Sequence, residues 1–378
     1  MVKVISIMID CLREDAGEKI GEMLKDKGIE YIVEGRIITP APWTLPSMVS
    51  FFSRTYPNVH KIHAGNFYIT DFKEIKNSIY SLNYWFAEEI YKKNIPTVGI
   101  STNIILSEYY GFNRGFKEFV TLPYAKTGRL YERINKINRN KVKHIPDKDI
   151  TQIRKLISNF VNKYSDMYLF SVIMNLHEPY YYNNKKTLNK AEILTLPPED
   201  RIVEINKIKS AYYSSLEFLL KKLYKMIRDI EDESIIILFG DHGQALGEHG
   251  YVFHQSFLYD ELIKSYAIII DKNEEKIKLD PPSYKKDNNI FDLISLGRLT
   301  LDVFQKNKTI KPYHYFKLFS KSFSYGTSHT PDYLPLPLYN NYLNNKYHAL
   351  VFPKIKLTIS TNTFEIKQGE YFFYTTRP

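Results

Sequence analysis

Residues 234–254 read SIIILFGDHGQALGEHGYVFH, an apolar run followed directly by aspartate, histidine and glycine. Apolar, β-branched runs that end in polar residues are typical of buried parallel strands. In open α/β sheets, ligands bind beyond the carboxyl ends of such strands. The segment from Asp241 to His254 is therefore predicted to follow a core strand and to carry part of a functional site.

Two other apolar runs deliver polar residues in the same way. The run 2–9 leads into Asp10, and the run 168–174 leads into Asn175 and His177. A further strand is expected at 97–101. A helix with one buried stripe is predicted from apolar residues spaced by three and four, namely Ile205, Ile208, Tyr212, Leu216, Leu219, Leu223 and Ile227. This alternation of strands and helices predicts a doubly wound α/β sheet.

Asp10, Asp241 and His242 offer two carboxylates and an imidazole, a mixed oxygen and nitrogen set that suits a divalent cation. The alternative for a single strand-end aspartate is a helix cap or a turn residue. His249 and His254 follow within the fourteen residues that begin at Asp241, and this clustering weakens the alternative. The sequence therefore predicts a metal site built from separate strand ends.

Thr44 lies in a proline-rich stretch, with Pro40 and Pro42 before it and Pro46 after it. The first two prolines disfavour helix before Thr44, whereas a first helical turn tolerates proline. Thr44 is thus predicted at a helix N-terminus, where exposed N–H groups and the helix dipole favour negative charge. That field would stabilise an alkoxide on Thr44, and the alternative is that Thr44 is simply an N-cap.

Taken in order, these segments resemble the sulfatase branch of the alkaline phosphatase superfamily. The strongest likeness is 240–250 (GDHGQALGEHG), continued by His254 and LYDE at 258–261, with weaker likeness at 10–15, 101–103 and 111–116. The resemblance covers roughly residues 1–305, predicted as the catalytic domain, and leaves 306–378 as a small subdomain packed on it. It implies an alkaline phosphatase-like, mainly parallel α/β sheet with helices on both faces. Strand-like runs at 347–352, 356–359 and 371–374 predict a small C-terminal α+β element with antiparallel strands.

The family's nucleophile motif is occupied here by Thr44-Leu45-Pro46-Ser47-Met48. Sulfatases oxidise a cysteine or serine to formylglycine, and threonine cannot yield that aldehyde because of its β-methyl group. Met48 also replaces the arginine that supports the aldehyde. Threonine nucleophiles are found in phosphodiesterase, phosphotransferase and phosphomutase relatives, so the resemblance favours a phosphate ester as substrate. Cys11 stands where sulfatases have a second aspartate and is expected to be a packing residue at the strand end.

Carried over residue by residue, the resemblance implies one divalent cation, which could be Mn, Zn, Mg or Ca. Asp10, Asp241 and His242 would hold it, and Thr44 would bridge to it as the nucleophile. The favoured mechanism is a two-step displacement that ends in hydrolysis or in transfer to an acceptor.

The same resemblance implies roles for four more histidines. His177 and His254 would be catalytic residues on the substrate side, and one of them would protonate the leaving oxygen. His60 and His249 would contact the substrate, with a purely structural role open for both.

The chain has 378 residues, with 52 Lys and Arg against 42 Asp and Glu, and the net charge of +10 favours anionic partners. No basic block or nucleic-acid-binding motif is present, so an anionic small-molecule or glycan ester is the expected partner and nucleic acid is not. The apolar run at 2–9 is short for a signal peptide, and no run reaches the length of a membrane span. A cytoplasmic location is therefore expected.

Three functions remain open at this point. The first is a metal-dependent hydrolase or transferase of phosphate monoesters or diesters with Thr44 as nucleophile. The second is a sulfatase that works without formylglycine. The third is an inactive relative that binds anions or glycans, and loss of metal ligands would indicate it. Asp10, Asp241 and His242 are all present, which favours the enzymes.

Overall fold

The structure is a computed structural model of the 378-residue chain. It describes residues 2–29, 33–62, 72–122, 150–230, 233–254, 258–272, 278–279, 290–304, 309–310, 316–321, 346–351, 355–360, 364–368 and 371–375. The predicted domain boundary between residues 305 and 306 lies outside these ranges.

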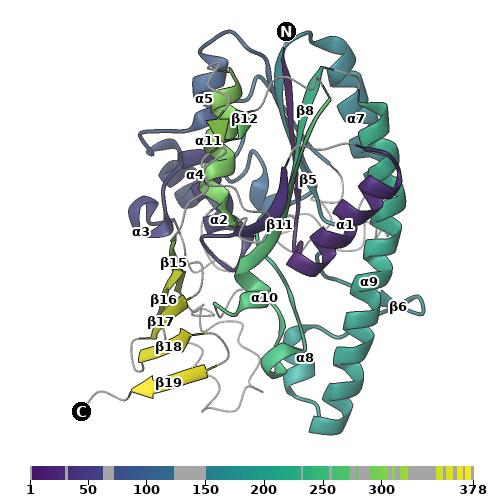
Figure 1. The fold of residues 1–378 in the computed structure, drawn as a ribbon, viewed down its shortest axis with the longest axis vertical. Coiled ribbons are helices and arrows are strands. Elements are labelled where there is room, and N and C mark those ends of the chain that lie inside the picture. Colours follow the sequence, from purple (N-terminus) through teal and green to yellow (C-terminus); the bar gives the residue numbers. More distant parts are fainter. Residues whose placement is uncertain are drawn as a thin grey trace.

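An eight-stranded sheet forms the centre of the molecule, in the order β13-β2-β11-β8-β1-β5-β3-β4 (Figure 1). Neighbouring strands are parallel except at β11, which runs antiparallel to both β2 and β8. The predicted mainly parallel, doubly wound architecture is confirmed. The strands are β1 (Lys3–Ile9), β2 (Val33–Ile38), β3 (Thr97–Ser101), β4 (Glu118–Thr121), β5 (Met167–Ile173), β8 (Ser234–Gly240), β11 (Lys264–Asp271) and β13 (Ile290–Asp292).

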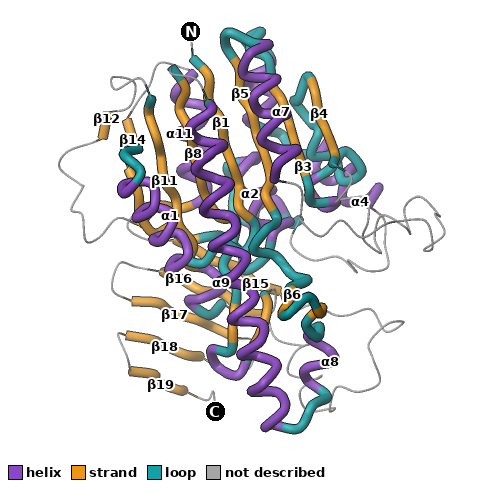
Figure 2. Tube along the Cα trace, turned by 90° about the vertical axis from the view of Figure 1, so that its right-hand side faces the viewer, coloured by secondary structure: helices purple, strands orange, loops and turns teal. Residues whose placement is uncertain are grey.

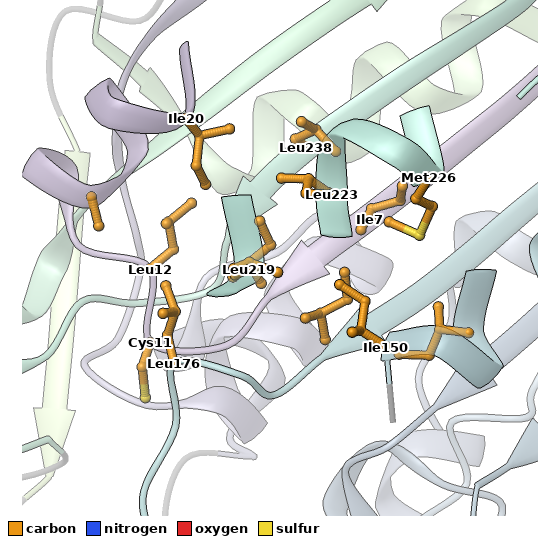
Figure 3. Close-up of a cluster of buried hydrophobic side chains, with 14 of the residues drawn as sticks. Ile7, Cys11, Leu12, Ile20, Ile150, Leu176, Leu219, Leu223, Met226 and Leu238 are labelled. Carbon is orange, nitrogen blue, oxygen red and sulfur yellow. The ribbon is translucent and has the colours of Figure 1, made fainter. Parts of the chain in front are cut away.

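Helices cover both faces of this sheet because alternate residues of its strands point to opposite sides. Val4 and Met8 of β1 belong to one apolar cluster, whereas Ile5 and Ile7 belong to a second cluster on the other face (Figure 3). The first face is covered by α2 (Thr44–Ser53), α4 (Phe72–Tyr80), α5 (Phe86–Tyr91) and α11 (Leu293–Phe304). The second is covered by α1 (Glu14–Asp26), α7 (Ile150–Lys163) and α9 (Pro198–Asp229).

The strands and the long helix lie where the apolar patterns predicted them. Strands β1, β3, β5 and β8 begin and end within one residue of the predicted runs. Helix α9 contains the predicted stripe, all of which is buried except the partly exposed Ile205. This helix is longer than the sheet and continues past its edge to the level of α8 (Lys190–Leu194) (Figures 1 and 2).

The last seventy residues contain a five-stranded antiparallel sheet in simple order. The predicted strand-like character of this region is confirmed, and its described residues are all in strands. The strands are β15 (Phe316–Lys321), β16 (Lys346–Val351), β17 (Ile355–Ser360), β18 (Phe364–Gln368) and β19 (Tyr371–Thr375). Strand β15 lies next to α3 (Pro57–His60) of the main body (Figure 1).

Short elements connect the larger ones around the carboxyl edge of the main sheet. They are η1 (Ile104–Leu106), η4 (Glu248–Gly250), α10 (Asp260–Ile263), and the strand pairs β6 (Tyr181–Tyr182) with β7 (Lys185–Lys186) and β9 (Ala245–Leu246) with β10 (Val252–Phe253). A further pair, β12 (Lys278–Leu279) with β14 (Thr309–Ile310), lies toward the opposite edge of the sheet (Figure 2).

Candidate metal centre and active site

Three neighbouring strands end at the same level of the sheet. Ile9 at the end of β1 pairs with Ile173 of β5 on one side and with Gly240 of β8 on the other. The residues that follow these ends, including Asp10 and Asp241, are therefore brought together at the carboxyl edge. Both carboxylates are fully buried, so each must find a partner or a counter-charge there.

His242 Nε2 is the meeting point of the predicted metal ligands. It lies 3.5 Å from Asp10 Oδ1, 3.4 Å from Asp241 Oδ2 and 3.3 Å from Thr44 Oγ1. Its other ring nitrogen, Nδ1, lies 2.7 Å from the Gly243 carbonyl oxygen. Because a carbonyl can only accept, Nδ1 carries the proton and the neutral ring directs its Nε2 lone pair at the two carboxylates.

The charges at this point are unbalanced without a cation. Burial raises the pKa of Asp241 well above its usual range, and the nearby Asp10 carboxylate adds to the rise. Burial also raises the pKa of Asp10, but positive charge on the neighbouring imidazoles of His177, His242 and His254 when they are protonated outweighs it and leaves that pKa below its ordinary value. Within the described residues, Asp241 Oδ2 has no hydrogen-bond partner although it is buried. Such an orphaned oxygen is costly, and a cation would satisfy it.

The residues present fit a divalent cation in spacing as well as in charge. Bonds of about 2.0–2.2 Å place neighbouring ligand atoms of a tetrahedral cation about 3.3–3.6 Å apart. The three distances from His242 Nε2 fall in that range. The ligand atoms that all lie within 4.8 Å of one another are those of Asp10, Cys11 and His242, and Asp241 joins the site through its 3.4 Å approach to His242 Nε2. Asp10, Asp241 and His242 would therefore hold the cation, with Thr44 Oγ1 beside it.

Thr44 is the first residue of α2, and the N-cap of that helix is Trp43. The Trp43 side chain makes no capping hydrogen bond, and the Thr44 hydroxyl is directed to His242 Nε2 instead of a helix amide. The alternative in which Thr44 is simply an N-cap is therefore wrong. Every residue of α2 is buried, and α11 approaches closely, since a Cβ on Gly297 would lie 2.4 Å from the Phe51 carbonyl oxygen. This packing fixes the helix that presents the Thr44 hydroxyl.

A second group of polar side chains lies next to the first. The rings of His177 and His254 are 5.1 Å apart, and those of His242 and His254 are 4.6 Å apart, measured between centroids. Glu178 Oε2 lies 3.7 Å from Nδ1 of both His177 and His254. Gln244 Nε2 donates to Glu178 Oε2 at 3.1 Å, and Gln244 Oε1 accepts from His254 Nδ1 at 2.9 Å. The structure thus brings both predicted substrate-side histidines next to the predicted metal ligand His242.

All three of these histidines are held in the same tautomer. His177 Nδ1 donates to the Glu178 carbonyl at 2.5 Å, just as His242 Nδ1 donates to Gly243 and His254 Nδ1 to the Gln244 amide oxygen. Each ring therefore presents Nε2 to the site. Burial, with His242 and His177 nearby, holds the pKa of His254 well below its usual range.

His60 and His249 belong to neither group of potential metal-ligand atoms found among the described residues. Both ring nitrogens of His60 make hydrogen bonds, with Ser50 Oγ at 3.0 Å and with the Ile62 N–H at 3.0 Å. The His249 ring stacks on Tyr259 at 4.3 Å. His60 is buried, whereas the His249 side chain is 42% exposed and its Nε2 lies 3.7 Å from Glu261 Oε1. Their predicted contact with substrate stays a prediction.

Sequence reasoning missed two residues that position the site. Asn103 Nδ2 donates to Asp10 Oδ2 at 2.9 Å while its Oδ1 accepts from the Ile105 N–H and begins η1. Gln244 is fully buried and orients both Glu178 and His254. Asn103 lies in the segment 101–103 and Gln244 in the segment 240–250, which both resemble the family. Their positions just after strand ends could have indicated that they belong to the site.

The contacts of Cys11 also differ from the prediction that it is only a packing residue. Cys11 is fully buried in the apolar cluster, as expected, but its Sγ also donates to Asp10 Oδ1 at 3.3 Å. Burial raises the pKa of the Cys11 thiol, and the Asp10 carboxylate raises it further. Cys11 is therefore part of the polar site and not solely a packing residue.

Comparison with known proteins identifies the family. The Sulfatase family model matches residues 30–294 of the chain, which contain Thr44, His177 and the segment from Asp241 to His254. The chain belongs to the sulfatase family. Because of this membership, the protein is an ester hydrolase or transferase. Members of the superfamily typically bind a divalent metal. No curated protein sequence matches the chain at a significant level.

Solved structures similar to this sulfatase-family protein share its fold at low sequence identity. A 2-O GAG sulfatase has a TM-score of 0.64 and 11% identity, covering 97% of this chain and 84% of the neighbour. Phosphonate monoester hydrolase from Silicibacter pomeroyi has a TM-score of 0.61 and 13% identity, with coverage of 98% and 90%. The C-terminal periplasmic domain of EcEptC from Escherichia coli, in complex with Zn, has a TM-score of 0.54 and 11% identity, with coverage of 80% and 81%.

The sulfatase-family chain shows no helix, over its described residues, with the length and apolar character that crossing a membrane requires.

Proposed function

We propose that this protein is a metal-dependent phosphate-ester hydrolase or transferase in which Thr44 is the nucleophile. The observation that carries the proposal is the position of Thr44 Oγ1, 3.3 Å from His242 Nε2 and at the first residue of a buried helix. A hydroxyl beside two buried carboxylates and an imidazole has a clear role only if it reacts there or binds the cation. The anionic ester substrate agrees with the net charge of +10.

The site residues divide the work of a two-step displacement. When bound, the divalent cation would neutralise charge on the phosphoryl oxygens and lower the pKa of the Thr44 hydroxyl. Thr44 releases its hydroxyl proton to solvent, and its Oγ1 forms a bond to phosphorus while the bond to the leaving oxygen breaks and that oxygen is protonated. The α2 N-terminus adds its dipole to the field on the attacking oxygen. Water or an acceptor alcohol then attacks the phosphothreonine and regenerates Thr44.

His177 is assigned as the acid for the leaving group. Of the two predicted candidates, His254 is held neutral because burial lowers its pKa well below the usual range. A neutral ring with Nδ1 donating to Gln244 presents a lone pair and no proton at Nε2. His177 is more accessible, with a side chain 20% exposed, and the Glu178 carboxylate lies 3.7 Å from it. His254 is then a positioning and binding residue.

The two other functions lead to different results in one experiment. The test is a panel of p-nitrophenyl phosphate, bis-p-nitrophenyl phosphate, p-nitrophenyl phenylphosphonate and p-nitrophenyl sulfate, each with Mn²⁺, Zn²⁺, Mg²⁺ or Ca²⁺ added to metal-stripped protein. Turnover of a phosphorus ester, with phosphate trapped on Thr44 and identified by peptide mass spectrometry, is expected. Turnover of the sulfate ester alone would assign a sulfatase without formylglycine. Binding of cation and ester without turnover of any ester would assign an inactive relative.

A further inference from the structure

We propose that Cys11 Sγ is a ligand of the cation held by Asp10 and His242, which makes this a zinc-class site and not a magnesium or calcium site. The inference rests on the proposed function in one respect, because the same cation serves Thr44. It goes beyond it by assigning a thiolate ligand and the chemical class of the metal.

Cys11 lies between the two carboxylates of the site. Its Sγ is 3.3 Å from Asp10 Oδ1, and its backbone N–H hydrogen-bonds the Asp241 carboxyl. Ligand atoms of Asp10, Cys11 and His242 all lie within 4.8 Å of one another, and all three side chains are fully buried. With a zinc–sulfur bond of about 2.3 Å and a zinc–oxygen bond of about 2.0 Å, the sulfur and oxygen of a tetrahedral site are about 3.5 Å apart.

A second observation independent of the cysteine points to a ligand at the same place. Asp241 Oδ2 is fully buried, has no hydrogen-bond partner within the described residues, and lies 3.4 Å from His242 Nε2. A cation at this place would satisfy that oxygen. Figure 3 shows Cys11 at the edge of the apolar cluster beside Leu12 and Leu176, with its sulfur at the border of the cluster.

The cation assigned to Cys11 is the one at Asp10 and not one held by the His177 and His254 group. Cys11 also lies near that group, with Sγ 3.7 Å from His254 Nδ1. That nitrogen carries a proton, because it donates to the Gln244 amide oxygen at 2.9 Å. A protonated nitrogen has no lone pair for a metal, so the closest nitrogen of His254 cannot share a cation with Cys11.

The identity of the donor atoms sets the class of metal. Thiolate is a soft ligand that favours zinc and disfavours calcium and magnesium, which prefer oxygen. Zn²⁺ accepts cysteine thiolate, histidine nitrogen and carboxylate oxygen as ligands, so all the donors present here suit it. On binding, the thiol proton is released to solvent and the sulfur coordinates as thiolate.

The chain offers an unusually direct test, because Cys11 is its single cysteine. Purified full-length protein is stripped with a chelator and reloaded with Co²⁺ or Cd²⁺, and bound metal is counted by elemental analysis. One cation per chain should appear together with a thiolate-to-metal charge-transfer band in the near ultraviolet. Only Cys11 can be the source of that band.

Variants locate the sulfur within the site. Cys11→Ser and Cys11→Ala should abolish the band and weaken zinc binding by at least about 10–100-fold, the range seen when the ligand environment of a metal is perturbed. Cys11→Asp, which supplies a hard oxygen, should shift preference from Zn²⁺ toward Mg²⁺ or Ca²⁺. The matched control is Leu176→Val, which trims the same apolar cluster and should leave both band and affinity unchanged.

The outcomes separate this inference from the proposed function. One Co²⁺ per chain without a charge-transfer band overturns the Cys11 assignment and leaves the cation site and Thr44 chemistry standing. Failure of the wild-type protein to bind any divalent cation overturns both. A band that survives Asp10→Asn but is lost in His254→Ala would place the sulfur in the other group and overturn the assignment.

Discussion

Replacing Thr44 with alanine separates the reacting role of this residue from its contribution to packing. The substitution removes a hydroxyl and a methyl group from a side chain that is 3% exposed. If Thr44 is the nucleophile, turnover should fall by at least about a thousand-fold, equivalent to about 4 kcal/mol of activation free energy. Thr44→Ser keeps the hydroxyl and should retain appreciable activity.

The cost to folding should be much smaller, and it can be worked out from the contacts. Losing one buried methyl group costs about 1 kcal/mol, and losing the 3.3 Å hydrogen bond to His242 Nε2 costs about another 1 kcal/mol. Alanine regains about 0.5 kcal/mol through its higher helix propensity. No cap is lost, because the N-cap is Trp43. The net loss is about 1.5 kcal/mol. Because a chain of this size loses at most about 2–4 °C of melting temperature per kcal/mol, the melting temperature should fall by only a few degrees.

The assay measures both quantities on the same preparations. Steady-state phosphodiesterase rates are compared for wild type, Thr44→Ala and Thr44→Ser, with metal content and melting temperature recorded for each. A folded, metal-loaded Thr44→Ala protein that keeps full activity would refute the assignment of Thr44 as nucleophile. An alanine variant that is inactive because it no longer binds the cation would show that Thr44 acts as a ligand.

Three further predictions concern residues around Thr44. His177→Ala should slow the turnover of alkyl esters about a hundred-fold more than that of p-nitrophenyl esters, because an acid matters most when the leaving oxygen is basic. His254→Ala should slow the turnover of both kinds of ester equally. Equal losses for the two kinds of ester in His177→Ala would contradict the acid role of His177. Burial and Asp10 raise the pKa of Asp241, so the folded metal-free protein binds a proton that the unfolded chain releases above about pH 4. The free energy of unfolding of the metal-free protein, measured in urea, should therefore fall as the pH rises from about 4 through the raised pKa of Asp241. If Asp241→Asn shows the same dependence on pH, the effect belongs to another group. Gly297→Ala should cost about 1–3 kcal/mol because its Cβ would meet the Phe51 carbonyl oxygen at 2.4 Å, and an unchanged melting temperature would show that α11 can move away.

Much of the sheet could be predicted because its central strands are buried on both faces. Continuous apolar runs such as 234–239 have few other structures available in a soluble protein, and the stripe in α9 has a helical period. Four of the eight strands, β2, β4, β11 and β13, were not predicted. The reversed direction of β11 leaves no mark on an apolar run. The membership of Asp10, Asp241 and His242 in one site could be inferred from their place after strands, since parallel strands share a carboxyl edge.

The parts of the site that escaped prediction depend on contacts between distant segments. Asn103 is 93 positions from the Asp10 carboxylate that it orients. The direction of Cys11 Sγ follows from a left-handed backbone at that residue, with φ of 61°, which a cysteine rarely adopts and a sequence pattern does not indicate. The acid role could not be divided between His177 and His254 until their unequal burial was known.

The flush ends of β1, β5 and β8 have a consequence for how such a site can change through evolution. The pairing of β1 with β5 and β8 ends at Ile9, Ile173 and Gly240, and one further backbone hydrogen bond joins the Asp10 N–H to the Ile173 carbonyl oxygen at 2.9 Å. Side chains beyond that point can be exchanged without breaking a backbone hydrogen bond between these strands. Position 11 lies just beyond the end of β1. If Cys11 is a ligand, as proposed above, a substitution there would change the cation that the site prefers while the pairing of the strands stays the same, so a lineage built on this scaffold could exchange its metal without rebuilding the sheet that supports it.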